Sequence, residues 1–249
     1  MTKISIIIPI LNEAESIVNL LKYLLQNSSK ENISEIIVVD GGSTDGSMEI
    51  IENFVSNRVQ SSTKHKHTTS PKETAIACIR SKKGRAKQMN FGAKNASGNI
   101  LYFLHADSFP PKNFDQFILE ETNQGHEAGC FIMKFNSNHC WLKLAGFLTR
   151  LPWRACRGGD QSLFISKSLF NSIGGFDETF KIYEDNIIIG KLYKLKKFVV
   201  IQKWLTTSAR RYKTNGVWTL QYHFIIIHLK KYFGTSAEHL SSYYKKHIK

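Results

Sequence analysis

Cysteine is scarce in this sequence of 249 residues. The four cysteines, no two of which are spaced as a CxxC pair, are Cys78, Cys130, Cys140 and Cys156. A framework of disulfides is typical of small secreted domains and is not expected in a chain of this length. We therefore expect reduced, structural thiols and a reducing compartment.

Long hydrophobic runs are also missing, because no segment stays apolar over the roughly 18 to 20 residues that a membrane-spanning helix needs. The longest candidate, 217–233, is interrupted by Gln221, His223, His228 and two lysines. The first residues enter a buried-strand pattern at once and lack the regions of a signal peptide. The sequence therefore predicts a cytoplasmic protein, with contact to the inner face of a membrane left open.

Acidic residues are few, at 20 against 34 lysines and arginines, and the formal net charge is +14. The usual partners of such a charge are nucleic acid, an anionic membrane and phosphorylated substrates. No recognised nucleic-acid-binding module occurs, so nucleic acid is not expected as a partner. We expect a single domain over 1–249, whose residues 210–249 form a basic and aromatic helical appendage.

Short β-branched runs alternate with helical patterns over the first hundred residues, which predicts an α/β fold with a mostly parallel central sheet covered by helices. Residues 4–8 and 36–39 have the composition of fully buried strands. The polar and basic segment 56–72 is expected to form a surface loop. Two separate short strands are expected near Val199 and Thr207.

Polar clusters follow three of the predicted strands, at residues 9–13, 40–43 and 105–107. Ligands of open α/β sheets bind beyond the carboxyl ends of the strands, so this convergence predicts a binding site. The chain has neither a GxGxxG motif after the first strand nor a GxxxxGK[ST] motif, which disfavours a dinucleotide site and a P-loop.

Two carboxylates in these clusters suit a nucleotide ligand. Asp40 precedes two glycines that allow close backbone approach, and it could accept hydrogen bonds from a base or ribose. Asp107 could hold Mg²⁺ or Mn²⁺ against a diphosphate, and His105 points to the same face of the extended segment.

Several motifs occur together in a characteristic order over roughly residues 4–212. They are IIPILNE (7–13), VVDGGSTDGS (38–47), GRAKQMN (84–90), LHAD (104–107), GF (175–176) and YED (183–185). The sequence resembles the family-2 glycosyltransferases of the GT-A fold. The resemblance is closest to a small bacterial subgroup with GDQ (159–161), TSARR (207–211) and a His-Ala-Asp variant of the Asp-x-Asp motif.

The resemblance implies a three-layer, nucleotide-sugar-binding α/β fold and an inverting, metal-dependent transfer of sugar from a nucleotide-sugar donor to an unknown acceptor. Asp107 would be the metal-binding carboxylate, and Asp185, beside Glu184, would be the general base for the acceptor hydroxyl. The residues implied to bind the donor are Pro9, Glu13, Asp40, Ser43, Arg85, Arg211 and Tyr212.

His105 stands where the family's motif has its first aspartate. A neutral imidazole ligates Mn²⁺ better than Mg²⁺, so either metal stays possible. The alternative is that His105 hydrogen-bonds the sugar or ribose. Asp160 and Gln161 could line the acceptor pocket, and an ordinary turn is the alternative for them.

Two other functions remain in competition. A sugar-nucleotide nucleotidyltransferase would use a similar fold, but it typically has a Gly-x-Gly-Thr-Arg loop where this chain has the acidic residues 12–15. A non-catalytic, nucleotide-sugar-binding protein at a membrane surface is the second rival. The aromatic and basic helix around 217–233 could lie in a membrane interface beside a lipid-linked acceptor, or could simply pack on the core.

Overall fold

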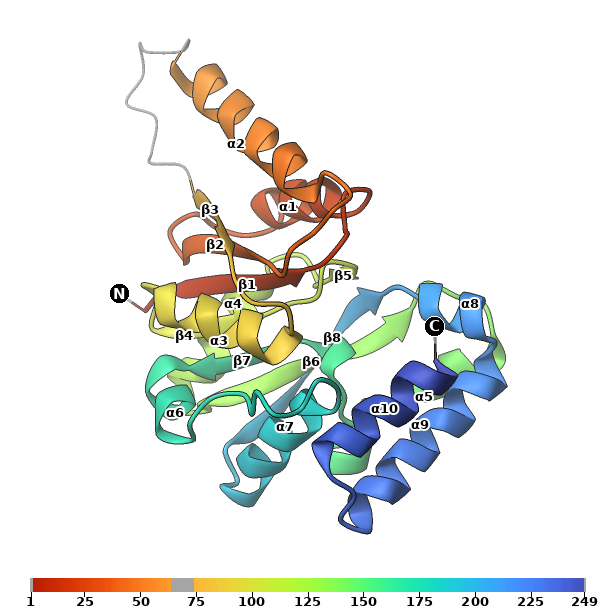
Figure 1. Cartoon of the computed structure of the whole chain (residues 1–249). Helices are drawn as coiled ribbons and strands as arrows, with labels where there is room; N and C mark the ends of the chain where they lie inside the picture. The colour runs from red at the N-terminus through yellow and green to blue at the C-terminus, as the bar shows by residue number, and fades with distance from the viewer. Residues whose placement is uncertain (1, 64–73, 249) are drawn as a thin grey trace.

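The computed structural model describes residues 2–63 and 74–248, which build one mixed, eight-stranded sheet with helices on both faces (Figure 1). The strand order is β3-β2-β1-β4-β7-β6-β8-β5. The strands are β1 (Ile4–Ile10), β2 (Ile33–Asp40), β3 (Ala75–Arg80), β4 (Ile100–Phe103), β5 (Ser108–Phe109), β6 (Ala128–Phe135), β7 (Leu163–Ser166) and β8 (Phe198–Thr207).

Neighbouring strands among β1 to β4 run parallel, as do β6 and β8, whereas β7 is antiparallel to both β4 and β6. The short β5 is antiparallel to β8 at the sheet edge. The predicted α/β fold with a mostly parallel sheet is confirmed.

The helices surround this sheet, and the last two of them pack against each other in a cluster of their own. They are α1 (Ile17–Gln26), α2 (Ser47–Thr63), α3 (Arg85–Asn95), α4 (Phe114–Asn123), α5 (Cys140–Leu148), α6 (Lys167–Ser172), α7 (Glu184–Lys194), α8 (Arg210–Asn215), α9 (Val217–Tyr232) and α10 (Ala237–His247), with 3-10 turns η1 (Arg154–Cys156) and η2 (Gly159–Gln161). Successive side chains of a strand point to opposite faces of the sheet, so the core consists of two clusters. Ile6 packs with α1 and α4 on one face, and Ile7 packs with α3 and α7 on the other.

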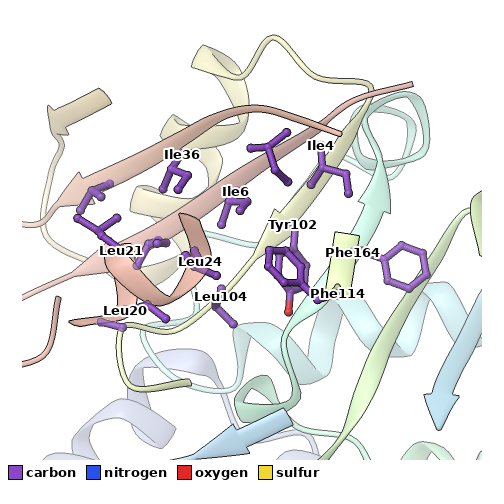
Figure 2. Close-up of a cluster of buried hydrophobic side chains, with 14 of the residues drawn as sticks. Ile4, Ile6, Leu20, Leu21, Leu24, Ile36, Tyr102, Leu104, Phe114 and Phe164 are labelled. Carbon is purple, nitrogen blue, oxygen red and sulfur yellow. The ribbon is translucent and has the colours of Figure 1, made fainter. Parts of the chain in front are cut away.

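The α1 layer shows why this part of the sequence is helical. Ile17, Leu20, Leu21 and Leu24 recur at helical spacing, and all four are fully buried. Figure 2 shows the three leucines turned toward Ile6 on β1. Burial of a leucine side chain contributes about 1.5–3 kcal/mol, so this stripe is sufficient to dock the helix on the sheet.

The start of α3 is held at the carboxyl ends of β1 and β2. The buried side-chain amide of Gln88 donates to the carbonyls of Ile10 at 2.7 Å and Val39 at 2.8 Å. One turn later, Gly92 lets the helix approach the sheet, since a Cβ there would lie 2.5 Å from Ile7 Cγ2. These contacts place Arg85, the first residue of α3, at the edge of the sheet where the polar clusters meet.

The change Gln88→Leu should lower the free energy of unfolding by about 1–3 kcal/mol, because two buried carbonyls each lose a hydrogen-bond donor. Urea unfolding would measure the loss. Gln116→Leu, at an exposed position of α4, is the matched control and should change stability by less than about 0.5 kcal/mol. Equal losses in the two variants would show that the hydrogen bonds of the Gln88 side chain contribute nothing measurable to stability.

Two predictions of local structure are wrong. Residues 56–63 continue α2, because polar composition alone does not distinguish an exposed helix from a loop. The rest of that predicted loop, 64–72, lies outside the described residues. The two strands expected near Val199 and Thr207 are the ends of one strand, β8. Its register against β6 shifts where the pairing passes from Ile201 to Trp204. This irregularity separates the segment around Val199 from the segment that ends at Thr207.

Candidate active site

A cleft of about 630 Å³ opens at the carboxyl ends of β1 and β4, where ligands of such sheets bind. Residues 9–11, Glu13 and 105–107 form one wall, and the beginning of α3 forms another. The C-terminal part of the chain closes the cleft through the end of β8, α8 and single side chains from α9 and α10. Segments far apart in the sequence therefore meet in one cavity.

The charged side chains on the cleft walls are mostly basic. The basic ones are Lys83, Arg85, Lys87, Lys181, Arg210, Arg211 and Lys245, and the acidic ones are Glu13, Asp107, Asp160 and Glu178. This excess of positive charge favours a ligand with several negative charges, such as a diphosphate.

An acidic centre interrupts the basic lining. His105 Nδ1 lies 3.5 Å from Asp160 Oδ1, and Asp107 follows two residues after the histidine. Burial raises the pKa of Asp107, and the charges of Asp160 and Glu13 raise it further, against the opposing effects of His105 and Arg210. A cation beside Asp107 would relieve this unfavourable environment of its carboxylate.

The Asp160 carboxylate is in the opposite electrostatic situation. Burial acts to raise its pKa, but the hydrogen bond and charge of His105, with the charges of Arg211 and Arg85, outweigh burial and lower the pKa to about 2. Asp160 is therefore ionised at neutral pH, and its side chain remains 46% exposed on the cleft wall.

The residues around Asp107 fit a divalent metal only if the ligand supplies part of the coordination shell. Within 2–63 and 74–248, no three His, Cys, Asp or Glu side chains converge as a ready-made metal site. Mg²⁺ is commonly held by one or two carboxylates together with substrate phosphates and water, which agrees with a single well-placed carboxylate. Because Nδ1 of His105 faces Asp160, only its Nε2 remains for a metal or a sugar.

Behind the cleft, Arg85 connects the first turns of α3 and α7. Its Nε lies 3.3 Å from Glu184 Oε1, and its Nη1 lies 3.3 Å from Asp185 Oδ2. Glu184 is only 1% exposed, and burial, together with the charge of Asp185, raises its pKa against the effect of Arg85. Asp185 is 15% exposed and lines a small cavity that shares His105 with the main cleft.

Gly159, in the 3-10 turn η2, leaves the space that the Asp185 carboxylate occupies. A Cβ at Gly159 would lie 2.0 Å from Asp185 Oδ2, whereas a Cβ at the preceding Gly158 would meet nothing within 4 Å. The position of Asp185 thus depends on the absence of a side chain at residue 159.

If Asp185 is the general base that the resemblance implies, the change Gly159→Ala should lower the kcat of transfer by roughly ten- to a hundredfold, because displacement of a reacting group by about 1 Å can cost a hundredfold in rate. Steady-state kinetics would measure kcat, and donor KM should change little. Gly158→Ala is the control and should retain parental kcat. If both variants kept parental kcat, the geometry of Asp185 would not limit turnover.

Among the residues that the resemblance assigns to the donor, Pro9 and Glu13 line the cleft, but Asp40 and Ser43 do not. The buried Asp40 carboxylate accepts hydrogen bonds from the backbone N–H groups of Gly42 and Ser43 and from the Ser43 hydroxyl. In this structure Asp40 organises the turn after β2. Its contact with a base remains a prediction.

Gln161 also lies off the cleft wall. Its side chain is buried, and its Oε1 accepts a hydrogen bond from the Gly158 N–H at 3.2 Å. These contacts are those of the turn that the sequence left as the alternative for this residue, whereas Asp160 does face the cleft.

Arg211 and Tyr212 line the cleft as a pair. Burial, with the charge of Asp160, raises the pKa of Tyr212 to about 12, so its hydroxyl stays protonated and can donate. The tyrosine ring packs edge-on against Phe135 at 5.3 Å.

Sequence reasoning did not identify several residues of the cleft. Arg210 Nη2 binds Glu13 Oε1 at 2.9 Å and so joins the beginning of the chain to α8. Phe180, Lys181, Phe224 and Lys245 form much of the C-terminal wall. The only signal for them was the basic and aromatic composition of the C-terminal third, which does not show where a side chain points.

Comparison with known proteins identifies relatives of this chain. The sequence model of glycosyl transferase family 2 matches residues 5–176, which is more than half of the chain. Glycosyltransferase AglE of Haloferax volcanii is 32% identical over 107 residues, covering 43% of this chain and 31% of that protein. An uncharacterized glycosyltransferase of Haemophilus influenzae is 34% identical over 109 residues, covering 44% and 38%. The matched segment thus spans about a third of these relatives.

Solved structures share the fold at low sequence identity. The mannosyltransferase PcManGT from Pyrobaculum calidifontis, in complex with GDP-Man and Mn²⁺, has a TM-score of 0.68 at 15% identity and covers 97% of this chain and 69% of its own. S. aureus TarS 1-349, in complex with UDP, has a TM-score of 0.62 at 18% identity and covers 83% and 60%.

Proposed function

Because the chain belongs to glycosyl transferase family 2, we propose that it transfers a sugar from a nucleotide-sugar donor to an acceptor hydroxyl with inversion at the anomeric carbon. The observation that carries this proposal is the cleft itself. It combines a basic lining with one half-buried carboxylate, Asp107, whose pKa is raised by burial and by neighbouring acids, so that a cation beside it would be favourable.

The donor diphosphate would lie between the acidic centre and α8. Arg211 would bind it from one side, and Tyr212 would cover the donor. Asp107, with Nε2 of His105 as a further ligand, would hold Mn²⁺ or Mg²⁺; the metal, when bound, would neutralise charge on the departing nucleoside diphosphate. The complexes of similar folds with GDP-Man and Mn²⁺ and with UDP-GlcNAc support a donor of this class.

The acceptor step would depend on the carboxylates at the start of α7. Asp185 would take the proton of the acceptor hydroxyl. The hydroxyl oxygen would attack the anomeric carbon as the bond between that carbon and the diphosphate oxygen breaks. Glu184, being buried, would act as a positioning residue by fixing the Arg85 guanidinium. Asp160, ionised and on the cleft wall, would accept hydrogen bonds from acceptor hydroxyls.

A thermal-shift screen of nucleoside-diphosphate sugars in the presence of Mn²⁺ tests the donor proposal. A ligand at a hundred times its Kd should stabilise the fold by about 2.7 kcal/mol, and the stabilising donors would then be assayed for hydrolysis with Mn²⁺ and with Mg²⁺. Stabilisation only by a nucleoside triphosphate with a sugar phosphate would indicate a nucleotidyltransferase instead. Donor binding without hydrolysis or transfer to any acceptor would favour the non-catalytic alternative.

A further inference from the structure

Helix α9 has apolar side chains on two faces, and only one face packs against the protein. Leu220 and Ile227 are buried in a cluster that includes Leu240 of α10. The opposite face carries the residues that we call the α9 stripe, which recur at intervals of three and four. They are Trp218, Tyr222, Ile225, Leu229 and Tyr232, with exposed fractions of 62, 60, 50, 48 and 84%.

The stripe lies on the outside of the molecule and continues toward a second helix. Figure 1 shows α9 and α10 as a helical pair far from α2. The Trp141 ring of α5 lies 5.4 Å from the Trp218 ring, and its Nε1 donates to Gln221 Oε1 at 3.4 Å. The solvent-exposed Leu144 and Phe147 follow on α5. Contiguous exposed apolar surface of this kind marks an interaction site.

The charge around the stripe selects among possible occupants. Glu238 is the only acid in residues 210–249, a segment with eight lysines and arginines, and α9 itself contains no acid. A second copy of the chain would bring surfaces of the same sign together, whereas a bilayer with anionic lipids presents the opposite sign. Exposed tryptophan and tyrosine beside leucine and isoleucine, on a helix flanked by lysines, suit the headgroup region of a bilayer.

We propose that the α9 stripe docks the protein on the surface of an anionic membrane, with α9 parallel to the bilayer plane. Within the part of the chain that the structure describes, no helix is long and apolar enough to span a bilayer. Phe224 of α9 and Lys245 of α10 line the cleft, and docking therefore brings the cleft close to the lipid headgroups. Access to a lipid-linked acceptor is a consequence that rests on the proposed function, whereas docking itself does not.

Co-sedimentation with phosphatidylcholine vesicles, with and without phosphatidylglycerol, tests the proposal over a sodium chloride series. The test variant is Ile225→Ser with Leu229→Ser. The control is Ile50→Ser with Leu195→Ser, which removes the same residue types from exposed positions, at 38 and 49%, in the first turn of α2 and just after α7. Circular dichroism would establish that both variants are folded.

The parent and the control should bind the anionic vesicles, more weakly as salt rises, because exposed charges are screened over about 8 Å at physiological ionic strength. The test variant should bind at least about tenfold more weakly, since two side chains no longer enter the apolar region. Parental binding by the folded test variant, or no binding of the folded parent to anionic vesicles at low salt, would overturn the proposal. The proposal would also be overturned if the parent did not bind vesicles but formed a dimer in light scattering, and if the test variant were monomeric.

Discussion

Replacing Asp185 with asparagine is expected to lower kcat by about 10²- to 10⁴-fold, the range that a general base contributes. Asparagine has nearly the same shape as aspartate, so the fit against Gly159 is preserved, but its amide cannot take the acceptor proton. Donor affinity should change little, because Asp185 lies behind the main cleft wall. Steady-state transfer kinetics and calorimetry of donor binding would measure the two quantities.

Glu184→Gln provides a control for this variant, because Glu184 contacts the same Arg85 guanidinium from the neighbouring position. Each variant removes one of the two carboxylates that hold Arg85 and leaves the other, so both should weaken its ion pairing to a similar extent. Only Asp185→Asn should remove the base, so its loss of kcat should be much the larger. Equal losses would show that the pair acts through Arg85 and that the base is a different group.

Asp107→Ala is expected to abolish the metal-dependent part of nucleoside-diphosphate binding. With Mn²⁺ present, the variant should bind UDP or GDP no more tightly than it does without metal. Without metal its affinity should equal or slightly exceed that of the parent, because an anion has been removed from a site for an anionic ligand. Isothermal titration calorimetry with and without Mn²⁺ would separate the two contributions.

Glu178→Ala controls for the general loss of negative charge, since Glu178 is an exposed acid on the same cleft. This variant should keep the parental response to Mn²⁺. If Asp107→Ala also kept it, Asp107 would not be a metal ligand. A loss of the response in both variants would point instead to the total charge of the cleft.

Much of the fold was predictable because its signals are local. The buried run in β1 and the helical spacing of Leu20, Leu21 and Leu24 each determine an element within a few residues. The same patterns predict where β1 and β4 end, and they therefore also predict that Asp107 lies at the edge of the sheet. The two residues of β5 and the six residues of α6, which are fewer than two helical turns, had no comparable signal.

The sequence by itself determined the fold class, the family and the strand ends at which the polar residues gather, because these depend on short-range order along the chain. Tertiary structure alone decided that Arg210 pairs with Glu13, and that Gln161 is buried while Asp160 faces the cleft. It also decided that Trp218 and its neighbours on α9 face solvent. The sequence shows which side chains of α9 are apolar, and these lie on two faces of the helix. Which face is exposed depends on the packing of α10 against the other one.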